Sequence, residues 1–167
     1  MVNNDNDHNS ETESWRQLPV FKKAATLLKL VEHLVDGIPL EESGSTTAYE
    51  CAMFEHHTKS MMENALIIPV KIAGAAGAEI YDHKMENATV IRKAARDIIT
   101  DTRGLQIAGF KEVEYLEVVR NEIEEFRPIF AEWIKTFNTS NYIIDRWGLF
   151  NPPGVDYNDQ DSPEDIY

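Results

Sequence analysis

The sequence predicts an all-α fold, an antiparallel up-down four-helix bundle with disordered acidic tails at the N- and C-termini. Between residues 15 and 137, apolar side chains recur at steps of three and four, which places them on one stripe of each helix. Sustained alternation of apolar and polar residues, the pattern of a half-buried strand, is not found. We therefore expect a disordered tail over residues 1–14, the bundle over 15–137 and an extended acidic tail over 138–167.

Turn and capping residues divide the bundle segment into four helices. They are expected over residues 15–36, 47–78, 83–108 and 112–137. Gly37 and Pro39 end the first helix, and Thr47 with Glu50 has the spacing of a capping box at the start of the second. Asp82 is placed to cap the third helix. Two prolines inside the second and fourth helices are expected to bend them, namely Pro69 and Pro128.

Composition excludes several classes of protein. The chain of 167 residues has a net charge of −13, of which residues 1–14 carry −4 and residues 145–167 carry −5. This acidity argues against broad nonspecific nucleic-acid binding but leaves room for a local basic patch. The single cysteine, Cys51, excludes an internal disulfide framework and is typical of a reducing compartment. We therefore expect a cytoplasmic protein.

Four segments of the chain match a known family. They are residues 18–24 (LPVFKKA), 38–42 (IPLEE), 65–74 (ALIIPVKIAG) and 95–110, the last ending in a Gly-aromatic pair. The chain resembles the four-helix-bundle proteins encoded in intervening sequences of large-subunit ribosomal RNA genes, often called S23-type. The accessory variability proteins of diversity-generating retroelements share that fold. Three positions depart from the family signature: Lys71 replaces Asn, Gly74 replaces Glu and Ala75 replaces Gly.

The resemblance implies a non-enzymatic bundle that assembles into a ring of five subunits and acts as an interaction scaffold. Some members of the family bind nucleic acid and a reverse transcriptase through a basic surface. The alternative function is therefore a nucleic-acid-associated accessory protein with RNA or a reverse transcriptase as its partner. Neither function needs a cofactor, a membrane or a small-molecule substrate.

The alternative function depends on basic residues of the third helix. They are Arg92, Lys93, Arg96 and Arg103. The three arginines share one face because their spacings are four and seven, as in a phosphate-binding stripe. Asp97 and Asp101 lie among these bases, so a solvated, ion-paired surface explains the same pattern.

Two further segments are candidate contact surfaces. Small residues and a proline near the end of the second helix form either an oligomer interface or tight intrachain packing: Pro69, Ala73, Gly74 and Gly77. Three apolar residues stand out in the C-terminal tail: Trp147, Leu149 and Phe150. The tail is either plain disorder, a segment that docks on the bundle or on the next subunit, or a binding segment for a separate partner.

Residues that carry catalysis or hold metals are not gathered in this sequence. Glu50 and His57 share a helix face, as do His56 and Glu63, but the Glu-x-x-His motif of di-metal bundles does not occur. Cys51 lies on the apolar stripe of the second helix, where a thiol is buried and inert. We therefore expect no catalytic residues and no metal site.

Overall fold

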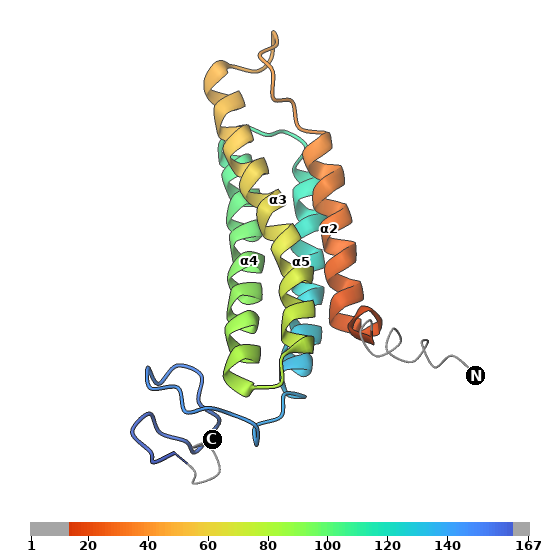
Figure 1. Ribbon diagram of the computed structural model, residues 1–167. Coiled ribbons are helices and arrows are strands. Elements are labelled where there is room, and N and C mark those ends of the chain that lie inside the picture. The colour runs from red at the N-terminus through yellow and green to blue at the C-terminus, as the bar shows by residue number, and fades with distance from the viewer. Residues whose placement is uncertain (1–13, 162–167) are drawn as a thin grey trace, which may run out of the picture.

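The computed structural model describes residues 14–161 and shows an antiparallel four-helix bundle (Figure 1). The elements are the short 3-10 helix η1 (Ser14–Gln17) and the α-helices α2 (Pro19–Asp36), α3 (Ala48–Gly77), α4 (Tyr81–Ile107) and α5 (Val113–Ile134). The predicted all-α, four-helix fold is confirmed over this part of the chain. The tail expected over residues 1–14 lies almost wholly outside the described residues.

Helix ends differ from prediction where local chemistry intervenes. The first helix begins at Pro19 rather than at residue 15, because proline has no backbone N–H and is best placed in a first turn. Helix α4 begins at Tyr81 with Ile80 as its N-cap, so the predicted cap by Asp82 is wrong. Asp82 lies instead in the first turn, where its carboxylate faces the positive end of the helix dipole.

The predicted capping box at the start of α3 is confirmed. The Thr47 hydroxyl accepts a hydrogen bond from the Glu50 backbone N–H at 3.2 Å, and the Glu50 carboxylate accepts one from the Thr47 N–H at 2.7 Å. These two bonds satisfy donors that the helix itself leaves unpaired. The pKa of the Glu50 carboxyl is lowered below its usual value, because the Thr47 N–H and, at 2.9 Å, the Thr47 hydroxyl both donate to the carboxylate and stabilise its charged form.

The helices form a square in which each helix packs on two neighbours. Helices α3 and α4 share the most extensive packing, and α4 and α5 the least. The core runs the length of the bundle and is filled by residues with almost no exposed surface, among them Leu27, Met61, Ile68, Ile72, Ile91, Ile98, Leu105, Leu116 and Phe126. Because α4 and α5 contact each other least, a groove remains between them on the outside of the core.

The segment after α5 is not the extended tail that the sequence predicts. Residues 138–161 form a series of turns at the end of the bundle where α3 and α4 join (Figure 1). Asn141 holds the segment there, since its carbonyl oxygen accepts a bond from the Tyr81 N–H at 2.9 Å. Its side-chain amide donates to the Glu79 carbonyl oxygen at 3.2 Å. The segment therefore has a defined position beside the α3–α4 connection.

Candidate interaction surfaces

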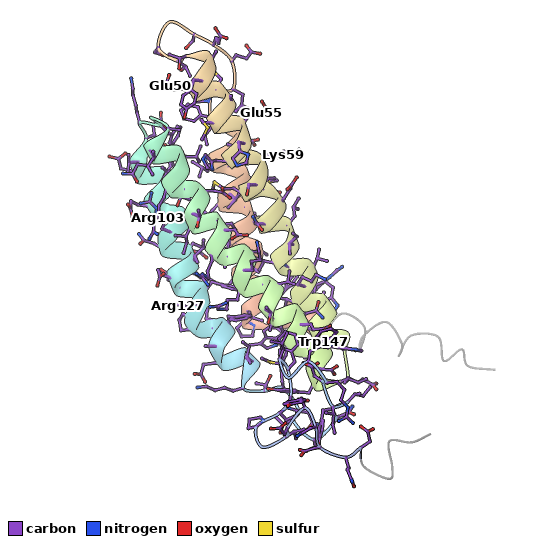
Figure 2. All side chains as sticks on the ribbon, turned by 90° about the vertical axis from the view of Figure 1, so that its left-hand side faces the viewer. Glu50, Glu55, Lys59, Arg103, Arg127 and Trp147 are labelled. Atoms are coloured by element: carbon purple, nitrogen blue, oxygen red, sulfur yellow. The ribbon has the colours of Figure 1, made fainter. Side chains whose placement is uncertain are left out.

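The stretch of α3 from Leu66 to Gly77 presents a mostly apolar surface to solvent, with the half-buried Lys71 as its one charged residue. Every residue classed as exposed between positions 66 and 77 is apolar or glycine, namely Leu66, Ile67, Val70, Gly74 and Gly77. The N-terminal half of the same helix carries Glu55 and Lys59 on its solvent side, as a solvated helix face normally does (Figure 2). We call the five uncharged residues the α3 face. Of the predicted interface residues, Gly74 and Gly77 belong to it, and Pro69 and Ala73 are half-buried beside it.

Intrachain packing does not require the two glycines of the α3 face. A methyl group added to Gly77 would meet no atom within 4 Å. One added to Gly74 would meet only the amide of the Asn87 side chain, at 3.3 Å. Neither residue has a positive φ angle, so the backbone does not require glycine either. Tight packing within the chain therefore does not explain Gly77, whereas Gly74 lies close to the Asn87 side chain.

A groove of about 390 Å³ runs between α4 and α5. Its floor is apolar and is made by Ala95, Ile99, Ile123, Phe126, Phe130, Ala131 and Ile134. Arg92 and Arg96 line it from α4, and Arg127 lines it from α5 together with Glu124, to which Arg127 is paired at 2.8 Å. We call this feature the arginine groove. Figure 2 shows Arg103 and Arg127 projecting on the same side of the bundle.

The arginines of α4 are not neutralised by the aspartates between them. Lys93 pairs with Asp97, but the guanidinium groups of Arg92, Arg96 and Arg103 contact no carboxylate of the described residues. Asp101 faces the inside of the bundle and is only 6% exposed. Of the four basic residues predicted on this helix, Lys93 alone forms such an ion pair within residues 14–161.

Asp101 belongs to a polar cluster that joins α4 to α3. One carboxylate oxygen lies 3.0 Å from Nδ1 of His57, and the other accepts a bond from the Ser60 hydroxyl at 2.7 Å. Ser60 thus donates to the aspartate and not to the histidine, so the three groups lack the serine–histidine bond that activates a nucleophile. The His57 ring lies against the backbone of Gly104, where a Cβ atom would come within 2.2 Å of the ring.

Lys84 links three elements at the end of the bundle. Its ammonium donates to the Ala75 carbonyl oxygen at 2.9 Å, in the last turn of α3, and lies 5.4 Å from the centre of the Phe137 ring. Burial lowers the pKa of Lys84 because it penalises the charged form. The bond satisfies a carbonyl group that α3 leaves unpaired, so we assign Lys84 a structural role.

The C-terminal turns hold a compact, exposed loop over residues 145–161. The Asp145 carboxylate accepts hydrogen bonds from the N–H groups of Trp147, Leu149 and Phe150, at 2.7–2.9 Å. These bonds lower the pKa of Asp145. Arg146 closes the loop by donating to the Tyr157 and Asp159 carbonyl oxygens and to the Asp161 carboxylate.

The apolar residues at the tip of this loop are not packed on the bundle. Trp147 is 89% exposed and Leu149 is 74% exposed, whereas Phe150 is half-buried. Figure 2 shows Trp147 at the end of the bundle where α3 and α4 join. Plain disorder is therefore wrong for residues 145–161, and docking of Trp147 and Leu149 on the chain's own bundle is not seen. We call this loop the Trp147 loop.

Within residues 14–161, no group of three or more His, Cys, Asp or Glu side chains is placed to hold a metal ion. Cys51 is buried, as its place on the apolar stripe predicted. The described helices include none that is long and apolar enough to cross a bilayer.

Comparison with known proteins gives one partial likeness. The chain is 28% identical over 91 residues to cytochrome P450 71B14 of Arabidopsis thaliana, a match that covers 53% of this chain. It covers only 18% of the P450, so the chain spans less than a fifth of that protein's length. No protein-family model matches the chain, and no solved structure matches it. The candidate surfaces are therefore interpreted from their own geometry.

Proposed function

We propose that this protein is a non-enzymatic helical-bundle scaffold that assembles into a cyclic homo-oligomer. The observation that carries the proposal is the α3 face, a solvent-facing stretch of a long helix whose exposed residues are all apolar or glycine, with Lys71 half-buried among them. The predicted family resemblance, which implies a ring, supports the same conclusion. A ring needs two different complementary surfaces on each subunit, and a bundle offers several.

Burial of the α3 face in a contact with another copy would be favourable. Leu66 is 46% exposed, Ile67 37% and Val70 67%, and each contributes about 25 cal/mol for every Å² of apolar surface removed from water. Gly74 and Gly77, which follow them on the helix, leave room for a neighbouring backbone to approach closely. In a helix that stays exposed to solvent, each of these glycines would lower helix stability by about 1 kcal/mol relative to alanine.

The proposal is tested by placing a charge at the centre of the α3 face. Val70→Lys should lower the molar mass measured by size exclusion with light scattering, because a buried lysine would lack a partner. Tyr49→Lys is the matched control, since Tyr49 is 70% exposed on the same helix but lies outside the α3 face. If Val70→Lys and Tyr49→Lys both keep the mass of the wild-type assembly, the α3 face is not the contact.

A second candidate function is that of a nucleic-acid-associated accessory protein, with RNA or a reverse transcriptase as the partner. It is favoured by the guanidinium groups of Arg92, Arg96 and Arg103, which are exposed on α4 and have no carboxylate partner in the described part of the chain. Fluorescence anisotropy with a labelled RNA at several salt concentrations tests it. Binding through these groups should weaken steeply with salt, and the logarithmic slope should fall by about one for each arginine replaced by alanine. Binding that is absent at low salt would refute it.

A further inference from the structure

We propose that the Trp147 loop of one copy docks into the arginine groove of a second copy. Trp147 and Leu149 would lie on the apolar floor between α4 and α5, and the carboxylates of the loop would face the arginines. The inference rests on the proposed self-association and deepens it, because it names both complementary parts of the contact.

The Trp147 loop is built to present its apolar residues outward. Three backbone N–H groups are bound by the Asp145 carboxylate, and Arg146 ties the two ends of the loop together. This network fixes the loop while Trp147 and Leu149 remain exposed. A segment that is already ordered loses little conformational entropy on binding, which favours a specific contact. Exposed tryptophan in such a loop is typical of residues that dominate binding energy.

The arginine groove has the chemistry that would receive such a loop. Its volume of about 390 Å³ lies within the usual range for binding pockets, and seven apolar residues form its floor. Arg92 and Arg96 on its wall have guanidinium groups without a carboxylate partner among residues 14–161, and such groups bind carboxylates and also stack on tryptophan faces.

Charge distinguishes this groove from the other large apolar groove of the bundle. The Trp147 loop carries four carboxylates and one guanidinium, a net charge of −3. The arginine groove carries three guanidinium groups and one carboxylate, a net charge of +2. The second groove, of about 510 Å³ between α2 and α5, has Glu132 as its one charged lining residue, and Glu132 is paired with Lys135, so the lining of this groove offers the acidic loop no positive charge. Complementary charge therefore selects the groove between α4 and α5.

The positions of the two parts give the contact a head-to-tail geometry. The Trp147 loop lies at the α3–α4 end of the chain, as does the C-terminal half of α3 that carries the α3 face (Figure 1). The loop and the α3 face together form a donor surface, and the arginine groove on the α4–α5 side is the acceptor. A contact between two different surfaces repeats from copy to copy and closes into a ring when the rotation permits it.

Complementation between two full-length variants tests this contact. Trp147→Ala removes the donor anchor, and the double variant Arg92→Glu with Arg96→Glu reverses the charge of the acceptor. Each variant alone should dissociate at a concentration at least tenfold above that of the wild type. An equimolar mixture should form a species of twice the 19.1 kDa chain mass, because one intact loop and one intact groove remain. Arg103→Glu is the control, since Arg103 lies on α4 but does not line the groove.

The outcomes separate this inference from the proposed function. If the wild type assembles and Trp147→Ala assembles equally well, docking of the Trp147 loop is refuted while the scaffold proposal stands. If the wild type is a monomer at every concentration, both fail. If Arg103→Glu weakens assembly as much as the double variant, or if assembly requires added RNA, the arginines act as a nucleic-acid stripe and the inference is refuted.

Discussion

Gly104→Ala should destabilise the bundle, although alanine normally strengthens a helix. A Cβ atom at this position would lie 2.2 Å from Cε1 and 2.3 Å from Nε2 of His57, far inside any real contact. The ring must therefore move and lose its 3.0 Å bond to the buried Asp101 carboxylate, or α3 and α4 must separate. Overpacking costs about 1–3 kcal/mol, and the lost bond to a charged group about 1.5–3 kcal/mol. The helix-propensity gain offsets about 1 kcal/mol.

The expected net loss is about 1.5–5 kcal/mol, or roughly 3–20 °C in the unfolding midpoint for a chain of this size. Thermal unfolding followed by circular dichroism measures it. The same substitution in a His57→Ala background is the matched control, because removing the ring removes the clash. There Gly104→Ala should be neutral or stabilising. An equal loss in both backgrounds, or no loss in the wild type, would refute the proposed contact between His57 and Gly104.

Four further predictions concern the helix ends and the C-terminal loop. Thr47→Ala should cost about 1 kcal/mol of unfolding free energy. Because the folded-state pKa of Glu50 is lowered, its carboxylate stabilises the fold fully above the usual pKa of 4.5. This stabilisation is lost as the pH falls through the folded-state pKa. The stability of the Glu50→Gln variant, measured by acid unfolding, should lack this pH-dependent loss. Asp145→Ala should leave the midpoint of the bundle unchanged but broaden the amide resonances of the Trp147 loop; unchanged resonances would contradict the network described. Lys84→Met should lower the midpoint by a few degrees, because it leaves a carbonyl group of α3 unpaired, and an unchanged midpoint would show that water replaces the bond.

The fold was predictable because its signals are local. The bounds of α3 and its capping box follow from Thr47, Glu50 and the apolar repeat, and the structure agrees to within one residue at each end. Asp101 was misplaced because its spacing from Lys93 put it among the bases, whereas its neighbours Ile98, Thr102 and Leu105 mark the buried side of the helix. The positions of these three neighbours in the sequence could therefore have predicted that Asp101 is buried.

The candidate surfaces were only partly predictable, because they combine elements distant in the sequence. The sequence predicted Arg92 and Arg96 as binding residues of the third helix. Arg127 and the apolar floor of the groove lie beside them only because α5 packs against α4. The structure of the Trp147 loop also escaped prediction, since it depends on one carboxylate accepting three backbone bonds. The Asp145-Arg-Trp-Gly148 turn, in which Gly148 has a φ of 71°, was its local signal.

The most direct test of the account is the solution mass of the wild-type chain, measured by size exclusion with light scattering over a range of concentrations at physiological salt. The account predicts a discrete assembly of several 19.1 kDa chains, and five would agree with the family resemblance. Salt should weaken the assembly only in part, because it screens the contacts between carboxylates and arginines but not the apolar contacts at the α3 face and under Trp147. A monomer at all concentrations would contradict the scaffold function and the docking of the Trp147 loop alike.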